Sequence, residues 1–134
     1  MSDLSLTGRC LCGRIRYRAG AALAPTTLCH CESCRRAQGA HVVGWFTVAA
    51  ASLQFDGDRP LEYASSPGVR RGFCGHCGTP LTYRSDTRAA EVDLTLATLD
   101  QASAYAPADH IWMEDALPWD RPQDGLPCHP RARP

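Results

Sequence analysis

Hydrophobic and polar residues alternate over much of the chain with the period of two that is typical of half-buried β-strands. Residues 14–18 (Arg-Ile-Arg-Tyr-Arg) alternate strictly, and residues 42–48 form a β-branched and aromatic run long enough for a central strand. Residues 91–96 alternate again. Shorter candidates are residues 53–55, 61–64, 69–73, 81–84 and 110–112. The pattern predicts a mainly β chain built from short strands.

Helical periodicity is scarce. The best candidate is residues 32–38, a short helix that Gly39 ends, because glycine readily takes the left-handed conformation of a helix C-cap. Half of the ten prolines follow Leu117, and proline disrupts both helices and central strands. We therefore expect residues 121–134 to be a proline-rich C-terminal tail that is packed on the surface or disordered.

The chain is neutral and has the size of one domain. Its 134 residues suffice for a single compact core. Fourteen acidic residues balance fourteen basic ones, all of them arginine, which argues against a protein that coats nucleic acid or anionic lipid. No window approaches the roughly 18 apolar residues of a membrane span, and the N-terminus lacks the regions of a signal peptide. We expect a cytoplasmic protein with no nucleic-acid or membrane partner.

Cysteine is the residue whose abundance needs a chemical explanation, since the chain has eight. Cytoplasmic thiols stay reduced, so crowded cysteines there more often bind metal; a secreted disulfide scaffold is the alternative. The cysteines fall as Cys10-x-Cys12, Cys29-x-Cys31-x-x-Cys34, Cys74-x-x-Cys77 and an isolated Cys128. Cys74-Gly-His-Cys77-Gly has the form of a zinc knuckle, and Cys10-Leu-Cys12-Gly is a shorter version.

The clustered cysteines indicate two kinds of metal site. Two knuckles from distant parts of a chain make a closed four-cysteine site that stabilises the fold. Three thiolates leave a tetrahedral ion one ligand short, and an open position distinguishes catalytic zinc from structural zinc. Seven cysteines thus divide into four and three. The spacing alone leaves open whether Cys10 and Cys12 join Cys74 and Cys77 or the middle cluster.

Other residues near these clusters have alternative interpretations. His30 and His76 lie inside the motifs, but neighbouring side chains in a tight loop tend to point away from the ion. His110 or His129 could complete the three-cysteine site or could be surface residues. A redox Cys-x-x-Cys motif is disfavoured because no helical pattern follows Cys77.

Six short motifs follow one another in a fixed order. They are Gly8-x-Cys10-x-Cys12-Gly13, Cys29-His30-Cys31-x-x-Cys34-Arg35, Gly39-Ala40, Ser65-Ser66, Arg71-x-Phe73-Cys74-x-x-Cys77-Gly78-Thr79 and His110-Ile111-Trp112. Together they resemble the glutathione-dependent formaldehyde-activating family, also called S-(hydroxymethyl)glutathione synthase or the GFA/CENP-V zinc domain. The resemblance covers about residues 5–120, which we take as the domain. Beyond Trp119 it continues only loosely, through Asp124-Gly-Leu-Pro.

The resemblance implies a Mss4-like β-sheet fold organised around zinc. It implies two zinc ions per chain, with Cys10, Cys12, Cys74 and Cys77 holding the structural one and Cys29, Cys31 and Cys34 the catalytic one. The implied enzyme is a carbon–sulfur lyase that brings a small-molecule thiol, glutathione or an analogue, to formaldehyde or another aldehyde. A three-thiolate zinc suits this chemistry, because a thiol that enters the open position loses its proton at neutral pH.

Substrate-binding residues can be proposed from the same motifs. Arg35 and Arg71 stand at motif positions, and guanidinium groups bind carboxylates such as those of glutathione. Ser66 and His110 are further candidates, the latter because imidazole titrates near neutral pH. A non-catalytic, zinc-stabilised binding module of the same family is the alternative function. A methionine sulfoxide reductase is disfavoured because Cys128 lacks the expected sequence context, and the oligomeric state, a dimer included, stays open.

Overall fold

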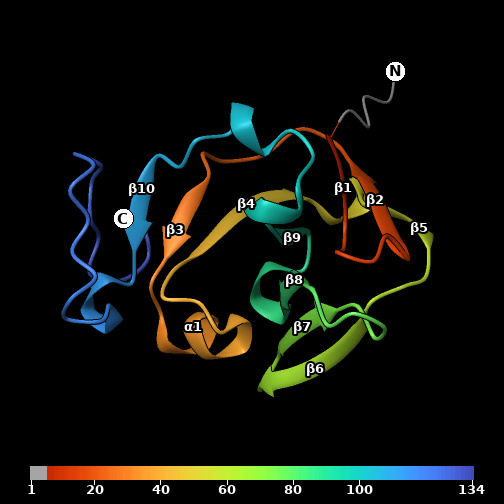
Figure 1. Ribbon diagram of the computed structural model, residues 1–134, viewed down its shortest axis with the longest axis horizontal. Coiled ribbons are helices and arrows are strands. Elements are labelled where there is room, and N and C mark those ends of the chain that lie inside the picture. The colour runs from red at the N-terminus through yellow and green to blue at the C-terminus, as the bar shows by residue number, and fades with distance from the viewer. Residues whose placement is uncertain (1–5) are drawn as a thin grey trace.

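The computed structural model describes residues 6–134, and Figure 1 shows its mainly β architecture. The strands are β1 Leu6–Arg9, β2 Ile15–Ala19, β3 Thr27–Cys29, β4 Val43–Ala49, β5 Gln54–Gly57, β6 Leu61–Ser66, β7 Val69–Phe73, β8 Pro80–Ser85, β9 Glu91–Thr95 and β10 Asp109–Ile111. The helix is α1, Glu32–Gln38, and the short 3-10 turns are η1 Ala50–Ser52, η2 Asp86–Arg88, η3 Leu96–Thr98, η4 Ala102–Ala104 and η5 Met113–Asp115. The prediction of a mainly β fold with little helix is confirmed. Among the described residues, no helix is long and apolar enough to cross a membrane.

The strands form two sheets. The smaller has the order β1-β2-β5, and the larger has the order β10-β3-β4-β9-β8-β7-β6. Neighbouring strands are antiparallel except β10 and β3, which run parallel. The order is not sequential, because β10 from late in the chain lies beside β3 from its first third (Figure 1). This pairing brings the C-terminal part of the chain next to the middle cysteine cluster.

Strand register gives the larger sheet two different faces. Residues that pair directly across strands share a face, and the faces alternate along each strand. One row across four strands consists of Gly72, Thr82, Leu94 and Phe46. The adjacent row consists of Arg71, Tyr83, Asp93 and Thr47. The first row faces the core, where Phe46 and Leu94 are buried, and the second row lines a cavity on the opposite face.

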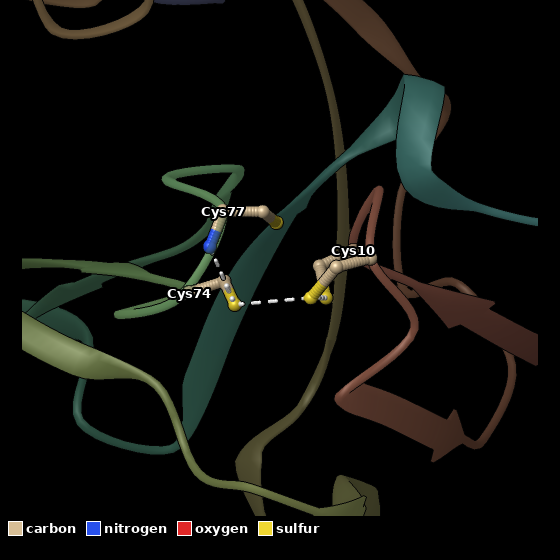
Figure 2. Close-up of side chains that lie close together, drawn as sticks. Cys10, Cys74 and Cys77 are labelled. Atoms are coloured by element: carbon tan, nitrogen blue, oxygen red, sulfur yellow. Dashed lines mark hydrogen bonds between the residues drawn. The ribbon is translucent and has the colours of Figure 1, made fainter.

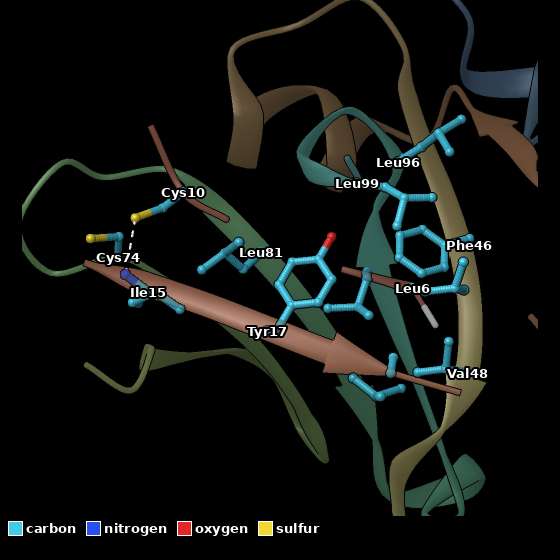
Figure 3. Close-up of a cluster of buried hydrophobic side chains, with 13 residues drawn as sticks. Leu6, Cys10, Ile15, Tyr17, Phe46, Val48, Cys74, Leu81, Leu96 and Leu99 are labelled. Atoms are coloured by element: carbon cyan, nitrogen blue, oxygen red, sulfur yellow. Dashed lines mark hydrogen bonds between the residues drawn. The ribbon is translucent and has the colours of Figure 1, made fainter. Parts of the chain in front are cut away.

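The main hydrophobic core lies between the two sheets (Figure 3). Side chains of β1 and β2, among them Leu6 and Tyr17, pack against Phe46, Val48 and others from the larger sheet. The Tyr17 ring crosses Gly8 so closely that a Cβ atom on this glycine would lie 2.2 Å from it. Only glycine therefore fits at this position of β1.

Two loops that are far apart in the sequence meet at one end of this core. The loop after β1 carries Cys10 and Cys12, and the loop after β7 carries Cys74 and Cys77. Figure 2 shows Cys10 facing Cys74 and Cys77 across the junction. Cys10 and Cys74 are fully buried and belong to the core itself. The junction thereby connects the smaller sheet to the larger one.

Helix α1 begins and ends where the sequence predicts. Cys31 is the N-cap residue, and its sulfur accepts a hydrogen bond from the Cys34 backbone N–H at 3.2 Å. Gly39 is the C-cap residue with a φ of 61°, the left-handed conformation that glycine adopts without strain. The seven-residue helix therefore carries one member of the middle cluster inside it and another at its cap.

All eight predicted strands are present, and their ends differ from the predicted ones by at most two residues. The sequence pattern missed β1 and β3. β1 contains the glycine that the Tyr17 ring requires, which interrupts the alternation, and β3 is only three residues long. β3 is a strand because β4 and β10 supply partners on both of its sides.

The C-terminal segment, residues 120–134, is extended and follows β10. The backbone N–H of His110 donates to the Pro127 carbonyl at 2.9 Å, and the N–H of His129 donates back to His110 at 2.8 Å. The Trp112 N–H donates to the Arg131 carbonyl at 3.0 Å. The segment lies beside β10 at the edge of the larger sheet (Figure 1).

Candidate metal centres

The first candidate metal centre is the four-cysteine cluster of Cys10, Cys12, Cys74 and Cys77. Its sulfur atoms all lie within 4.8 Å of one another. The Cys10–Cys12 sulfur distance is 3.6 Å and the Cys12–Cys74 distance is 3.8 Å. Sulfur ligands of a tetrahedral zinc, with Zn–S bonds of about 2.3 Å, lie about 3.8 Å apart. The cluster therefore fits a closed zinc site, and the fold brings Cys10 and Cys12 to Cys74 and Cys77 rather than to the middle cluster.

Backbone N–H groups point at the sulfurs of this cluster. Ile15 donates to the Cys10 sulfur, and His76 and Cys77 both donate to the Cys74 sulfur, each at 3.4 Å. The Thr79 hydroxyl lies 3.1 Å from the Cys77 sulfur and, with the Thr79 backbone, lowers the pKa of that thiol to about 5. Hydrogen bonds of this kind stabilise thiolates, the form in which cysteine binds metal.

The second candidate metal centre is the three-cysteine cluster. Cys29 ends β3, Cys31 caps α1 and Cys34 lies one turn into the helix. Their sulfur atoms lie within 4.8 Å of one another, and Cys29 and Cys34 are buried. Hydrogen bonds with Cys29 and Cys34 lower the pKa of Cys31, whereas hydrogen bonds with Cys31 and Cys34 raise the pKa of Cys29. The set of donors is one sulfur short of a tetrahedral shell and fits a three-thiolate zinc.

The three cysteines line a cavity of about 400 Å³. Its floor is the outer face of the larger sheet, with the row from Arg71 to Thr47. Trp45 and Tyr83 form an aromatic wall, with ring centroids 6.0 Å apart and planes inclined by 63°. Trp112 adds a further ring, and it is the one non-glycine residue of the described chain with a positive φ, 58°. The cavity thus has an aromatic wall on one side and the candidate metal ligands on the other.

Arg71 differs from the other arginines of this cavity. Its guanidinium lies 5.0 Å above the centre of the Tyr83 ring, and its Nε donates to the Ser65 hydroxyl at 3.3 Å. Arg88 is paired with Asp93 and Glu91, and Arg133 is paired with Asp109. Within residues 6–134, Arg71 makes no ion pair. It is therefore the cation of the cavity that remains available to an anionic ligand.

A second hollow adjoins the cavity and shares Trp45 and Arg71 with it. This groove has a volume of about 640 Å³ and runs between α1 and the strands β6 and β7. Arg36 and Gln38 line it from the helix, and Ser65 lines it from β6. Together the two hollows provide room for a ligand that extends well beyond the three-cysteine cluster.

The other predicted substrate-binding residues lie in different surroundings. The Nε of Arg35 is buried and has no hydrogen-bond partner among the described residues, and Arg35 does not line the cavity. Ser66 faces a separate hollow with Pro67 and Gly68. His110 is buried, and both of its ring nitrogens are hydrogen bonded to protein side chains, at 2.9 Å to His30 and 2.7 Å to Asp124. Of the four, Arg71 is the one that lies at the three-cysteine cluster.

The histidines and the eighth cysteine stay outside both clusters. His30 bonds His110, and the Nε2 of His129 lies 3.5 Å from Asp109. Neither these two nor His76 shares a group of candidate metal ligands. Cys128 is exposed, and all eight cysteines are free thiols, so no disulfide scaffold is formed. The interpretation of seven clustered cysteines as four plus three agrees with this grouping.

The sequence did not single out Tyr83, Asp93 or Thr47 as residues of the cavity. Hydrophobic and polar residues alternate along the strands that carry them, so the sequence shows these three positions to be polar or amphipathic. Which side chains of different strands lie beside one another depends on the register between the strands. An aromatic residue of a small β domain is more often part of the core, and Trp45 is buried while it also lines the cavity.

The fold is mainly β, with one closed four-cysteine cluster and one three-cysteine cluster beside a cavity, so it carries two candidate metal centres. The sequence profile described as "Glutathione-dependent formaldehyde-activating enzyme" matches residues 5–115, and the chain belongs to this family. The match covers both cysteine clusters and the whole row of cavity residues.

One curated relative and one solved structure are similar to the chain. An "Uncharacterized lyase C29B12.13" of Schizosaccharomyces pombe is 32% identical over 76 residues, which is 57% of this chain and 55% of the relative. The chain thus spans about half the length of this curated relative. The crystal structure of a Rhodobacter sphaeroides protein has a TM-score of 0.60 and 19% identity, and it covers 92% of this chain and 98% of its own. That likeness concerns the fold alone.

Proposed function

We propose that the chain is a zinc-dependent carbon–sulfur lyase of the glutathione-dependent formaldehyde-activating type. Its substrates are a small-molecule thiol, such as glutathione, and formaldehyde or another aldehyde. In the synthetic direction a bond forms between the thiol sulfur and the carbonyl carbon. The π bond of the carbonyl breaks, and its oxygen takes up the proton that the thiol loses. No oxidant or reductant is needed, because the product is a hemithioacetal.

The observation that carries this proposal is the contrast between the two cysteine clusters. One brings four sulfurs together at the junction of the two sheets, and the other brings three sulfurs together at the wall of a cavity. A tetrahedral ion takes four ligands, so the fourth ligand of the second site would come from the cavity. The membership of the family and the lyase name of the Schizosaccharomyces pombe relative support a reaction of this class.

Cys10, Cys12, Cys74 and Cys77 would hold a structural zinc, and Cys29, Cys31 and Cys34 would hold a catalytic one. When bound at the second site, zinc supplies a positive charge that lowers the pKa of a substrate thiol to near neutrality. The protein supplies orientation, since the aromatic wall of Trp45 and Tyr83 excludes water from one side of the cavity. A cytoplasmic location suits such an enzyme, because eight cysteines must stay reduced.

Arg71 is the residue that we propose to recognise the thiol. It lies at the three-cysteine cluster, lines both hollows and makes no ion pair among the described residues. Glutathione carries two carboxylates, and guanidinium binds a carboxylate through two parallel hydrogen bonds. The position of Arg71 would hold the body of the substrate in the groove while its sulfur reaches the cysteines.

The experiment that tests the proposal measures the exchange between free and glutathione-bound formaldehyde by NMR. Zinc-loaded protein at micromolar concentration should accelerate this exchange, and the Cys34→Ser variant should not. Metal analysis of both proteins gives the matched control, with two zinc ions expected for the wild type and one for the variant. Wild-type protein that holds two zinc ions but leaves the exchange rate unchanged would contradict the proposal and indicate a binding module.

A further inference from the structure

A chain of hydrogen bonds connects the C-terminal segment to the three-cysteine cluster. The Asp124 carboxylate lies 2.7 Å from the Nε2 of His110, and the Nδ1 of His110 lies 2.9 Å from the Nε2 of His30. Both histidines are buried, with 4% of His110 and 1% of His30 exposed. Asp124 belongs to the extended segment beside β10, and His30 stands between two cysteines of the cluster.

The carboxylate at one end gives the chain a direction, because it selects the tautomer of the histidine that it contacts. An ionised carboxylate only accepts, so the Nε2 of His110 donates to Asp124. The Nδ1 of a neutral His110 then accepts from the Nε2 of His30. The orientation of both imidazole rings is thereby fixed from the Asp124 end. The hydrogen bond from His110 also lowers the pKa of Asp124, which keeps this carboxylate ionised.

The His30 side chain lies on the side of the Cys29–Cys31 segment that faces away from the cavity. Successive side chains of an extended segment point in opposite directions, so His30 faces β10 while Cys29 and Cys31 face the cavity. Its backbone N–H donates to the Ile111 carbonyl of β10 at 3.0 Å. A displacement of the His30 ring would therefore move the segment that sets the distance between the Cys29 and Cys31 sulfurs.

A second carboxylate of the same segment approaches His30 from its other side. The Oδ2 of Asp120 lies 3.5 Å from the Nδ1 of His30 and 2.7 Å from the Nδ1 of His41. The His30 ring thus lies between His110 and Asp120. Both acidic groups come from residues 120–124, in a part of the chain that follows the region matched by the family profile.

We infer that Asp124 and His110 are positioning residues for the three-cysteine cluster. They act through His30, whose ring fixes the segment from Cys29 to Cys31 and hence the distance between the sulfurs of these two cysteines. The inference rests on the proposed metal site at this cluster. It gives the C-terminal segment a role in assembling that site, in addition to covering the edge of β10.

The test compares metal affinity at the two clusters of the full-length protein. Zinc release to a chromogenic chelator should show two phases, and Cys34→Ser identifies the phase of the three-cysteine site by removing it. We expect Asp124→Ala and His110→Phe to weaken zinc binding at this site by about 10- to 100-fold, the usual effect of removing groups that orient metal ligands. The phase of the four-cysteine site should be unchanged, so this site is an internal control for general destabilisation.

Two further variants separate positioning from attachment of the segment. Asp124→Asn keeps an oxygen that accepts from His110, and it should restore most of the affinity that Asp124→Ala loses. Glu114→Ala removes the ion pair to Arg131, which also attaches the segment but touches neither histidine, and it should leave both phases unchanged. Cobalt substitution supplies a readout without turnover, because the thiolate-to-cobalt absorption of the three-cysteine site should shift in Asp124→Ala and His110→Phe but not in Glu114→Ala.

The outcomes are distinguishable. Unchanged affinity of the three-cysteine site in folded Asp124→Ala and His110→Phe would overturn the inference. An equal loss at both clusters would overturn it as well, since that is the result of lower stability alone. A wild-type protein with a single release phase that Cys34→Ser does not alter would instead overturn the proposed function, because the three-cysteine cluster would then hold no zinc.

Discussion

The guanidinium of Arg71 lies against the sulfur of Cys34, with Nη1 3.8 Å and Nη2 3.9 Å from Sγ. A cation at this distance favours the thiolate form of cysteine. The same guanidinium has no carboxylate partner among the described residues and borders both hollows. One side chain is therefore placed to contact the cluster and an anionic substrate together.

Arg71→Ala should raise the KM for glutathione by about 10- to 100-fold, because a lost hydrogen bond to a charged group costs about 1.5–3 kcal/mol. A thiol without carboxylates, such as 2-mercaptoethanol, should show no such dependence. Steady-state kinetics with both thiols checks this. Arg70→Ala is the matched control, since Arg70 is adjacent in β7 but pairs with Asp86 at 3.1 Å and does not line either hollow. Equal effects of the two substitutions would contradict the role of Arg71.

The two cysteine clusters should respond differently to substitution. Cys74 is 1% exposed and belongs to the core, so Cys74→Ser should remove the metal link between the sheets and bury a hydroxyl group. We expect this variant to melt at a much lower temperature, or not to fold. Cys34→Ser should retain most of the thermal stability. Circular dichroism of both variants gives the comparison, and a larger loss for Cys34→Ser would show that the assignment of the structural cluster is wrong.

Asp109 gives the stability of the protein a specific dependence on pH. Burial opposes its ionisation, but hydrogen bonds from Arg133 and from the Thr27 hydroxyl at 2.6 Å lower the pKa of its carboxyl group. A lowered pKa in the folded state adds stability above the unfolded value of about 4, and this contribution is lost as the pH falls through the folded value. Arg133→Gln should therefore reduce the free energy of unfolding by about 1–2 kcal/mol at pH 7.

Urea unfolding at pH 7 and at successive values below 4 tests this dependence. The difference between wild type and Arg133→Gln should be largest at pH 7 and should shrink as Asp109 becomes protonated. Arg131→Gln serves as the control, because its partner Glu114 is much more exposed than Asp109. A difference that stays constant down to low pH would exclude Asp109 as its source.

Gly8→Ala should destabilise the fold by about 1–3 kcal/mol, the usual cost of overfilling a well-packed core. The added Cβ would lie 2.2 Å from the Tyr17 ring and 2.5 Å from the Thr98 carbonyl oxygen. Gly39→Ala is a useful comparison, since its Cβ would meet nothing within 4 Å and only the left-handed backbone is strained. Chemical denaturation should show the larger loss for Gly8→Ala, and equal losses would mean that β1 moves away from the ring.

The sequence was informative where local chemistry determines structure. The extent of α1 follows from a capping side chain at Cys31 and a left-handed glycine at position 39, both within one short segment. β3 was not recognised, because its three residues are held by β4 and by the distant β10. Pairing between distant segments leaves no periodic signal in either of them.

The candidate site shows the same division. The cysteine motifs and Arg71 could be identified from spacing and from the family pattern, since each motif is local. Tyr83 and Asp93 become neighbours of Arg71 only through the register of three strands. Asp124 was visible as part of a loose C-terminal match, but its bond to His110 depends on how the extended segment follows β10.

Strand β7 connects Arg71, which contacts the three-cysteine cluster, to Cys74 of the four-cysteine cluster. Arg71 lies on it and Cys74 follows its last residue, so only about 10 Å of extended chain separates the arginine at the cavity from a sulfur of the closed cluster. We expect a loosening of that cluster to displace Arg71, because the two are joined by this short strand. Depletion of metal from the four-cysteine cluster should therefore lower the affinity for substrate before the protein unfolds.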